Sequence, residues 1–214
     1  LQCFANNTYM GNCTFNVSSP VHPSLRRHAK GRYHFFANES QRGVVLTNTS
    51  VHNHTSTQTG AVHSDRVTIL TSSFVDNRGE YGGALFASRA RHVLVASSMF
   101  ARNRANVHGG AVYLDDDTRS FNTSLDGLLI RNSDFVNNTA MGKGGAVYAT
   151  TQCHPLTVSN SSLERNVAWE GGAMQIDTSM NVLLNVSRFV NNSGMSGAAL
   201  SVRGPRRGSN DNLL

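Results

Sequence analysis

The chain is poor in the residues that helical, membrane-spanning and disulfide-stapled proteins use. Of its 214 residues, 15% are charged, and there are only 4 prolines, 3 cysteines and 1 tryptophan. Low charge beside abundant Asn, Ser, Thr and Gly disfavours helices with Lys/Glu-rich surfaces and favours a turn-rich β protein. No apolar run approaches the roughly 20 residues that cross a bilayer, and the first residues lack a signal-peptide pattern. We therefore expect a fragment of a longer chain, without a transmembrane segment.

The net charge indicates which binding partners to expect, and the number of cysteines limits the possible disulfides. The formal net charge is +6 and the pI is about 9.7, which suits an acidic glycan as partner. No dense run of Lys and Arg is present, so we expect no nucleic-acid partner. Three cysteines cannot all pair within one chain. Cys3 and Cys13 are a candidate disulfide, which leaves Cys153 buried or linked elsewhere.

A repeated phrase dominates the sequence. Phe-x-x-Asn recurs and is followed a few residues later by Gly-Gly-Ala, as in Phe74–Asn77 with Gly82–Ala84. The later copies begin at Phe100, Phe135, Leu163 and Phe189. A repeat of roughly 20–50 residues indicates a solenoid, because each unit buries its apolar face only against a neighbour.

Apolar residues alternate on both sides of the phrase, which predicts two or three short strands per repeat. Inward positions precede the Phe at Val67/Ile69, Val93/Val95, Leu128/Ile130, Leu156/Val158 and Val182/Leu184, and others follow the glycines. Short strands and tight turns at this spacing predict an all-β, right-handed parallel β-helix. Stacked coils would align the Asn residues into an inward ladder of Asn53, Asn77, Asn103, Asn138, Asn166 and Asn192.

The phrase also sets expected boundaries within one β-helix segment, 1–214. We expect a partial first coil at 1–17, an inserted excursion at 18–42 and regular coils at 43–203. A loop insertion is expected near 115–126 and a flexible tail at 204–214. The first coil matches the repeat phrase less well. We expect Ser50 at its Phe position, preceded by Val45 and Thr47.

Phe-x-x-Asn coupled to Gly-Gly-Ala-[Ile/Leu/Val] resembles the repeat of chlamydial polymorphic outer-membrane proteins. Similar right-handed β-helix repeats occur in surface proteins of algae and protists. The resemblance covers about Val45 to Val202. It implies an extracellular structural or adhesive role, and in the bacterial family the matching region is a surface domain implicated in adhesion.

The chain is dense in Asn-x-Ser/Thr sequons, which distinguishes it from a bacterial member and favours the eukaryotic secretory pathway. Asn6, Asn137 and Asn191 lie two residues after the repeat Phe, an outward position. Asn53 and Asn160 are expected to be unmodified, because they fall in the ladder and in a column shared with Thr71, Ser97 and Asn132. The predicted glycosylation sites are Asn6, Asn12, Asn16, Asn38, Asn48, Asn122, Asn137, Asn185 and Asn191.

The rival interpretation is a polysaccharide lyase or hydrolase, since parallel β-helices also carry such sites. The densest carboxylate candidate is Asp115, Asp116 and Asp117 beside Arg119, which is also a weak candidate for calcium. A loop triplet of Asp is more often a solvated turn. His52 and His54 would share a strand face, yet a surface pair explains them better than a metal site. Tyr81, Tyr113, Tyr148 and Trp169 suggest either a sugar-stacking face or aromatic pairs across coils.

The sequence favours a non-enzymatic structural or adhesive module in a secreted, glycosylated surface, matrix or filament assembly, for example one like a flagellar hair. We expect no cofactor beyond N-linked glycans. The expected partners are other surface or filament proteins, including end-to-end contacts with further copies.

Overall fold

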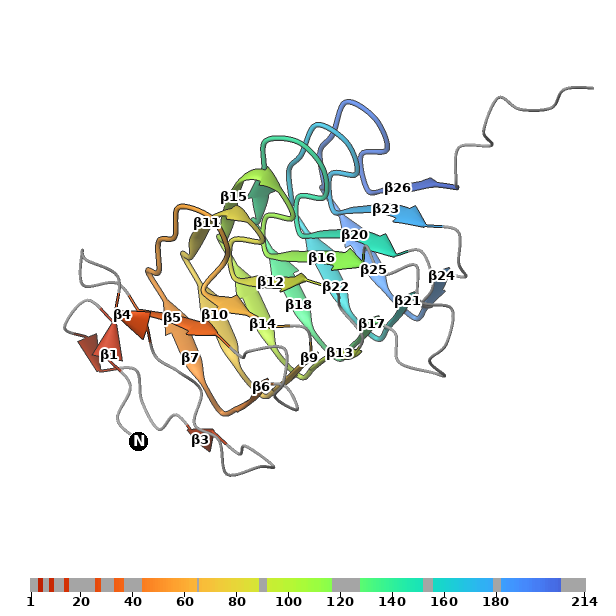
Figure 1. Ribbon diagram of the computed structural model, residues 1–214. Helices are drawn as coiled ribbons and strands as arrows, with labels where there is room; N and C mark the ends of the chain where they lie inside the picture. Colours follow the sequence, from red (N-terminus) through yellow and green to blue (C-terminus); the bar gives the residue numbers. More distant parts are fainter. Residues whose placement is uncertain are drawn as a thin grey trace, which may run out of the picture.

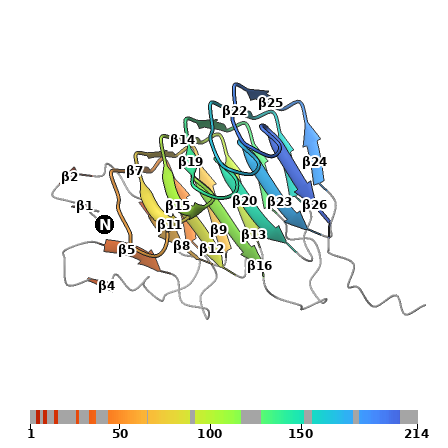
Figure 2. The same ribbon diagram turned by 90° about the horizontal axis from the view of Figure 1, so that it is seen from above.

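The computed structural model describes residues 44–64, 66–88, 92–116, 128–151, 156–178 and 182–204, together with short strands between residues 4 and 36. Every regular element in this part of the chain is a strand, and successive coils stack side by side along one axis (Figures 1 and 2). The expected all-β parallel β-helix is confirmed. Because these residues form strands and turns, they contain no apolar helix of membrane-spanning length.

Three sheets line the coils, and each coil from residue 44 onward contributes one strand to each sheet. The seven-stranded sheet contains β3 (Thr14–Phe15), β6 (Val44–Thr47), β9 (Arg66–Leu70), β13 (His92–Ala96), β17 (Leu128–Arg131), β21 (Leu156–Ser159) and β24 (Val182–Asn185). The six-stranded sheet contains β7 (Ser50–His52), β10 (Ser73–Val75), β14 (Met99–Ala101), β18 (Asp134–Val136), β22 (Ser162–Glu164) and β25 (Arg188–Val190).

The third and largest sheet follows the glycines. It contains β4 (Arg26–Arg27), β5 (Tyr33–Phe36), β8 (Val62–His63), β12 (Leu85–Ser88), β16 (Val112–Asp116), β20 (Val147–Thr151), β23 (Met174–Thr178) and β26 (Leu200–Arg203). Smaller sheets are formed by β11 (Arg78–Tyr81), β15 (Arg104–His108) and β19 (Thr139–Ala140), and by β1 (Phe4–Ala5) and β2 (Thr8–Tyr9).

The register of the strands follows the repeat phrase. Phe74 pairs with Phe100, and Phe100 pairs with Phe135 in parallel strands. The rings of both pairs stack with centroids 4.8 Å apart and are fully buried. This distance equals the strand spacing of a sheet, so each ring sits directly over the next. The core is therefore a set of apolar columns inside the coils.

The amide ladder sets the bend after each Phe. Asn77 Nδ2 donates to Asn103 Oδ1 at 3.0 Å and to the Val51 carbonyl oxygen at 2.9 Å, and its backbone N–H also donates to Asn103 Oδ1. Asn103, Asn138 and Asn166 repeat these bonds, and Asn192 is the last acceptor. The ladder residues Asn77, Asn103, Asn138 and Asn166 are fully buried. Each side chain thus satisfies backbone groups that the bend takes out of the sheet.

The second glycine of each pair permits close coil contact. A Cβ on Gly110 would lie 2.0 Å from the Gly145 carbonyl oxygen, and one on Gly145 would lie 2.0 Å from the Gly172 carbonyl oxygen. No real Cβ tolerates such a contact, so glycine is required wherever a further coil follows at this spacing.

The segments before residue 43 depart from the expected boundaries. β3 runs antiparallel to β6, so it does not continue the parallel coils as a partial first coil would. β5 pairs in parallel with β8, so part of the expected 18–42 excursion lies in the largest sheet. The expected loop and tail, apart from Asp115, Asp116 and Gly204, lie outside the described residues.

We predict that Asn138→Ala lowers the free energy of unfolding by about 3 kcal/mol or more, because it leaves buried donors and an acceptor of neighbouring coils without partners. Asn192→Ala is the matched control and should cost about 1 kcal/mol, since Asn192 is part-buried and ends the ladder. Urea unfolding measures both. Equal losses would contradict a buried ladder as the main constraint.

A second bend places non-glycine residues in the left-handed region. Its members are Asn48, Thr71, Ser97, Asn132, Asn160 and Val186, with φ between 46° and 50°. Asn tolerates this conformation, whereas a β-branched side chain is strained in it. Val186 is 79% exposed, so its side chain gains little from packing in exchange.

Val186→Asn is therefore expected to raise the free energy of unfolding by about 1 kcal/mol through relief of backbone strain. The matched control is Leu183→Asn, which changes an exposed apolar residue on β24 outside the left-handed column. Thermal and urea unfolding of bacterially expressed protein measure both changes. A Val186→Asn variant that is less stable than the control would refute the strain.

Candidate functional site

One column of outward residues lies immediately before the amide ladder. We call it the bend column: Asn53, Asp76, Arg102, Asn137, Arg165 and Asn191. Each has φ between 52° and 57°, which turns the backbone outward at the bend. All are exposed except Asp76, which is partly exposed. The column is therefore a display surface that repeats once per coil.

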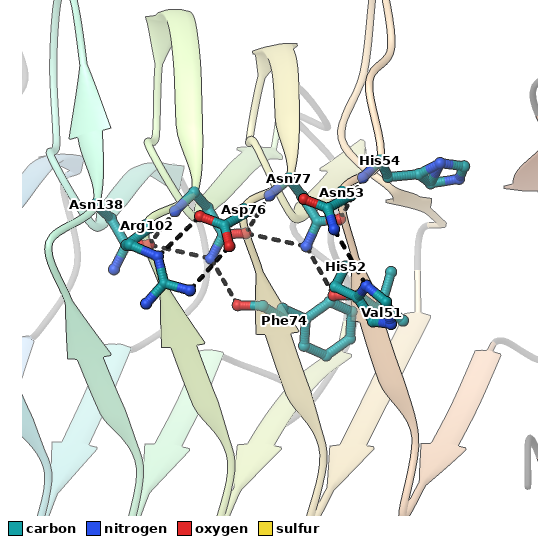
Figure 3. A network of polar contacts seen from close by, with 10 residues as sticks. Val51, His52, Asn53, His54, Phe74, Asp76, Asn77, Arg102 and Asn138 are labelled. Atoms are coloured by element: carbon teal, nitrogen blue, oxygen red, sulfur yellow. Dashed lines mark hydrogen bonds and ion pairs between the residues drawn. The ribbon is translucent and has the colours of Figure 1, made fainter. Parts of the chain in front are cut away.

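Ion pairs and hydrogen bonds cross between coils in the bend column. Arg102 Nε and Nη2 donate to the two carboxylate oxygens of Asp76, each at 2.8 Å (Figure 3). The hydrogen bond from Arg102 lowers the pKa of Asp76 below its usual value. Farther along, Arg165 Nε donates to Asn137 Oδ1 at 3.2 Å. Bidentate pairing fixes the Arg102 side chain, although the pair remains open to solvent.

The first coil differs by one residue from the expected register. Val51 pairs with Phe74, so Val51 occupies the Phe column, and the inward residues before it are Val44 and Leu46 rather than Val45 and Thr47. His54 takes the ladder position, where its backbone N–H donates to Asn77 Oδ1 at 3.0 Å. The placement of Asn53 in the amide ladder was wrong.

Asn53 instead lies in the bend column, with Nδ2 3.4 Å from His52 Nδ1 (Figure 3). It shares this exposed position with Asn137 and Asn191, so the reason for expecting it to be unmodified no longer holds. His52 and His54 are not side by side either: His54 is 5% exposed and lies at the bend, while His52 is partly exposed in β7.

Asn160 was placed correctly in its column, but that column faces solvent. Asn160 is exposed, and its Nδ2 donates to Asn132 Oδ1 at 2.6 Å. Asn48, a predicted glycosylation site, occupies the same column, so burial gives no reason to separate the two. Asn185 is exposed at the end of β24. Five predicted sites and all three cysteines lie outside the described residues: Asn6, Asn12, Asn16, Asn38, Asn122, Cys3, Cys13 and Cys153.

A second candidate is a group of aromatic and charged residues that come from the largest sheet, from β11 and β15, and from the turns before the glycines. We call it the outer cluster: Tyr81, Phe86, His108, Tyr113, Lys143, Tyr148, Glu170 and Asp177. Phe86 and Tyr113 stack with centroids 5.1 Å apart and planes within 15°, and Tyr113 contacts Tyr148 at 5.2 Å. Tyr148 is only 6% exposed. The facing sides of the Phe86 and Tyr113 rings cover each other, so aromatic pairing across coils fits them better than sugar stacking.

Among the described residues, Trp169 makes no ring contact with this cluster, and it is 59% exposed. It lies in the turn before the glycines, between Met141 and Met195 of the neighbouring coils, which are also exposed. Of the aromatic residues singled out from the sequence, Trp169 is therefore the one whose side chain is most open to solvent.

The charged part of the outer cluster is centred on Asp177. Its Oδ2 accepts from Lys143 Nζ at 2.6 Å and from Tyr148 Oη at 2.9 Å, while Oδ1 accepts from Gln175 Nε2. Burial alone would raise the pKa of Asp177, but the hydrogen bonds from Lys143, Gln175 and Tyr148 outweigh it and hold the pKa below its usual value.

The environment favours the neutral forms of Tyr148 and His108, whereas it favours the charged form of Asp177. Burial raises the pKa of Tyr148 far above its usual value, and the negative charge of Asp177 adds to this effect. Burial lowers the pKa of His108, and the charge of Lys143 adds to it. His108 Nδ1 accepts from the Lys143 backbone N–H at 3.1 Å, as a neutral ring does. Lys143, Gln175 and Tyr148 thus all donate to the Asp177 carboxylate, while Glu170, the second carboxylate of the cluster, lies 4.0 Å from Lys143 Nζ.

Asp115, the first aspartate of the triplet, has a structural role. Asp115 Oδ1 accepts from Thr150 Oγ1 at 3.1 Å across coils. The side chains of Asp116 and Asp117 lie outside the described part of the chain. Among the residues whose side chains are described, no three His, Cys, Asp or Glu gather closely enough to hold a metal ion.

The structure also contains a ladder of serine residues, which the sequence analysis did not predict. The backbone N–H of Ser72 donates to Ser98 Oγ, that of Ser98 to Ser133 Oγ, and that of Ser133 to Ser161 Oγ, each at 3.1 Å. The sequence contains the pattern that would have predicted this ladder, because Ser stands two residues before the repeat Phe in successive coils. The full phrase is therefore Ser-x-Phe-x-x-Asn. Ser72 and Ser98 of this ladder also border an open groove of about 530 Å³, together with Thr71, Ser97 and Asn132.

The stacked coils define the class of protein, a parallel β-solenoid built from one repeated unit. Residues 132–150, which include Phe135, Asn138 and Gly144–Ala146, match the model of the Chlamydia polymorphic membrane protein (Chlamydia_PMP) repeat. The chain is accordingly a β-helix repeat protein like the polymorphic membrane proteins. No curated protein and no solved structure matched the chain. The matched repeat suggests a surface or adhesin-like module.

We predict that the Asp177 network makes stability depend on pH in the acid range. Because the folded-state pKa of Asp177 is lowered, its contribution is present above 3.8, the ordinary value, and is lost as pH falls through the folded-state pKa. Asp177→Asn should therefore lower Tm at pH 7, and the difference from wild type should shrink below pH 3.8. Asp134→Asn, which changes an exposed carboxylate, is the control. A difference that does not change with pH would contradict the network.

Proposed function

We propose that this chain is a non-enzymatic structural and adhesive module of a secreted, glycosylated cell-surface, matrix or filament assembly. The observation that carries the proposal is the bend column, in which Asn53, Asn137 and Asn191 stand exposed in sequons on three different coils. The surface character of the matched repeat family supports it. A eukaryotic secretory origin is the condition under which these sequons acquire glycans.

The residues that stabilise the fold are distinct from those exposed on the surface. Asn138 is fully buried and bonded within the ladder, whereas its neighbour Asn137 is exposed one position earlier. A glycan on Asn137 would extend into solvent without disturbing the ladder. Exposed arginines on the same surface, among them Arg102, Arg165 and Arg188, suit acidic glycans as the adhesive partner.

The test is glycopeptide mapping of the chain after expression through a eukaryotic secretory pathway. We expect glycans at Asn53, Asn137 and Asn191. Thr139→Ala removes the Asn137 sequon while leaving both Asn137 and Asn138 in place, and should abolish that glycan alone. Secreted, folded protein with all three sites bare would overturn the glycosylated-surface proposal.

Adhesion is tested with the same protein on beads. Beads carrying the folded chain should bind immobilised acidic polysaccharide, and binding should fall when Arg102, Arg165 and Arg188 are replaced by Gln. Measured polysaccharide cleavage that is lost when Asp115, Asp116 and Asp117 are replaced by Asn would instead favour the lyase or hydrolase alternative.

A further inference from the structure

An open groove crosses the coils where the seven-stranded sheet turns into the six-stranded sheet. It lies between the ends of β6, β9, β13 and β17 and the starts of β7, β10, β14 and β18 (Figure 1), and its volume is about 530 Å³. The left-handed bend residues Asn48, Thr71, Ser97 and Asn132 line it, one from each coil. The groove therefore presents an equivalent polar side chain once per coil.

The lining of the groove suits a neutral ligand that is rich in hydroxyl groups. Hydroxyls and amides predominate among the described residues that line it, with Asp134 as the single carboxylate and no Lys, Arg or His. Within the described part of the chain, the hydroxyls of Thr71 and Ser97 make no hydrogen bond, and Asn132 uses only Oδ1, which accepts from Asn160. Hydroxyl and amide groups both donate and accept, as is needed to pair with the hydroxyls of a sugar.

The backbone of the groove is not available to an extended peptide. The N–H of Thr71 donates to the Ala96 carbonyl oxygen, and that of Ser97 donates to the Arg131 carbonyl oxygen, each at 3.1 Å. A peptide that binds by strand addition needs unpaired backbone groups at a sheet edge, whereas these bends are paired with the next coil. Only side chains can therefore contact a ligand here, and Met99, which is 43% exposed, adds an apolar contact to the polar ones.

A glycosylation sequon lies at one end of the groove. Asn48, followed by Thr49 and Ser50, belongs to the first of the four coils, is exposed and is itself a lining residue. A glycan attached to Asn48 has the next three coils of the groove within reach. An open groove holds a free neutral glycan weakly, but a covalent tether supplies an effective concentration in the millimolar range.

We propose that the groove binds the N-linked glycan of Asn48, which lies along the bends and contacts Thr71, Ser97 and Asn132. The docked sugars are neutral, which distinguishes this site from the exposed arginines to which we assign acidic glycans. The glycan covers one side of the stack, whereas glycans in the bend column extend into solvent. The inference rests on the secreted, glycosylated state proposed above, because only in that state does Asn48 carry a glycan.

The experiment compares the release of glycans from the folded, secreted chain by an endoglycosidase. Expression with an inhibitor of mannose trimming gives every occupied site the same type of oligomannose glycan, and glycopeptide mapping at successive times follows each site separately. We expect release at Asn48 to be about five-fold slower than at Asn137, because only the undocked fraction of the glycan is cleaved. Asn137 serves as the internal reference, since it is exposed in the bend column.

Ser97→Arg should block the groove and raise the release rate at Asn48 to that at Asn137. Arginine fits this backbone, because Arg102 adopts a φ of 53° and Ser97 has a φ of 50°. The matched control is Val186→Arg, which places the same side chain in the same left-handed position of a later coil, outside the groove. The control should leave the ratio of the two rates unchanged.

Circular dichroism and Tm establish that the variants fold, and Thr71→Arg is a second substitution that blocks the groove. Equal release at Asn48 and Asn137 overturns the proposal. So does slow release at Asn48 that persists in both blocked variants, since it would mean crowding at the attachment site itself. A bare Asn48 beside a glycosylated Asn137 also overturns the proposal but leaves the glycosylated-surface function intact. Loss of the bend-column glycans is the separate outcome that would overturn that function.

Discussion

The amide ladder holds the coils at one fixed spacing, and the other regularities of the fold depend on that spacing. Each buried Asn accepts from the preceding coil and donates to two acceptors, so it bonds correctly only when the next coil lies one strand spacing away. At this separation the phenylalanine rings stack and the serine hydroxyls reach the neighbouring backbone. The same distance leaves no room for a Cβ at Gly110 or Gly145.

Once the inward columns are fixed in this way, the outward positions are free to vary. The bend column holds Asn, Asp and Arg in successive coils with nearly the same φ, which shows that the backbone and not the side chain determines the turn. Some neighbours use this freedom to form contacts such as that between Asp76 and Arg102. A rigid interior combined with a variable exterior suits a surface module, since recognition can change without loss of the fold.

Most of the fold could be predicted because apolar alternation and the recurring Phe, Asn and glycines each report the same register. The first coil was displaced by one residue, since Val51 and His54 replace the marker residues and Asn53 lies beside the true position. The aromatic pairs of the outer cluster were among the predicted alternatives, but its charged part was not predictable. Lys143 meets Asp177 across 34 positions, and neither belongs to the repeated phrase, so only the stacked structure brings them together.

The ends of a solenoid require a different explanation from its middle. Inside the stack every strand edge is covered by the next coil, so stability accumulates coil by coil. Among the described residues, β24, β25 and β26 are the last strands of the three sheets, and Val202 is 51% exposed although its partner Ile176 in the preceding coil is fully buried. Ala198 stands in this coil where the inner coils have the second glycine, and the close contact between inner coils depends on the absence of its methyl group.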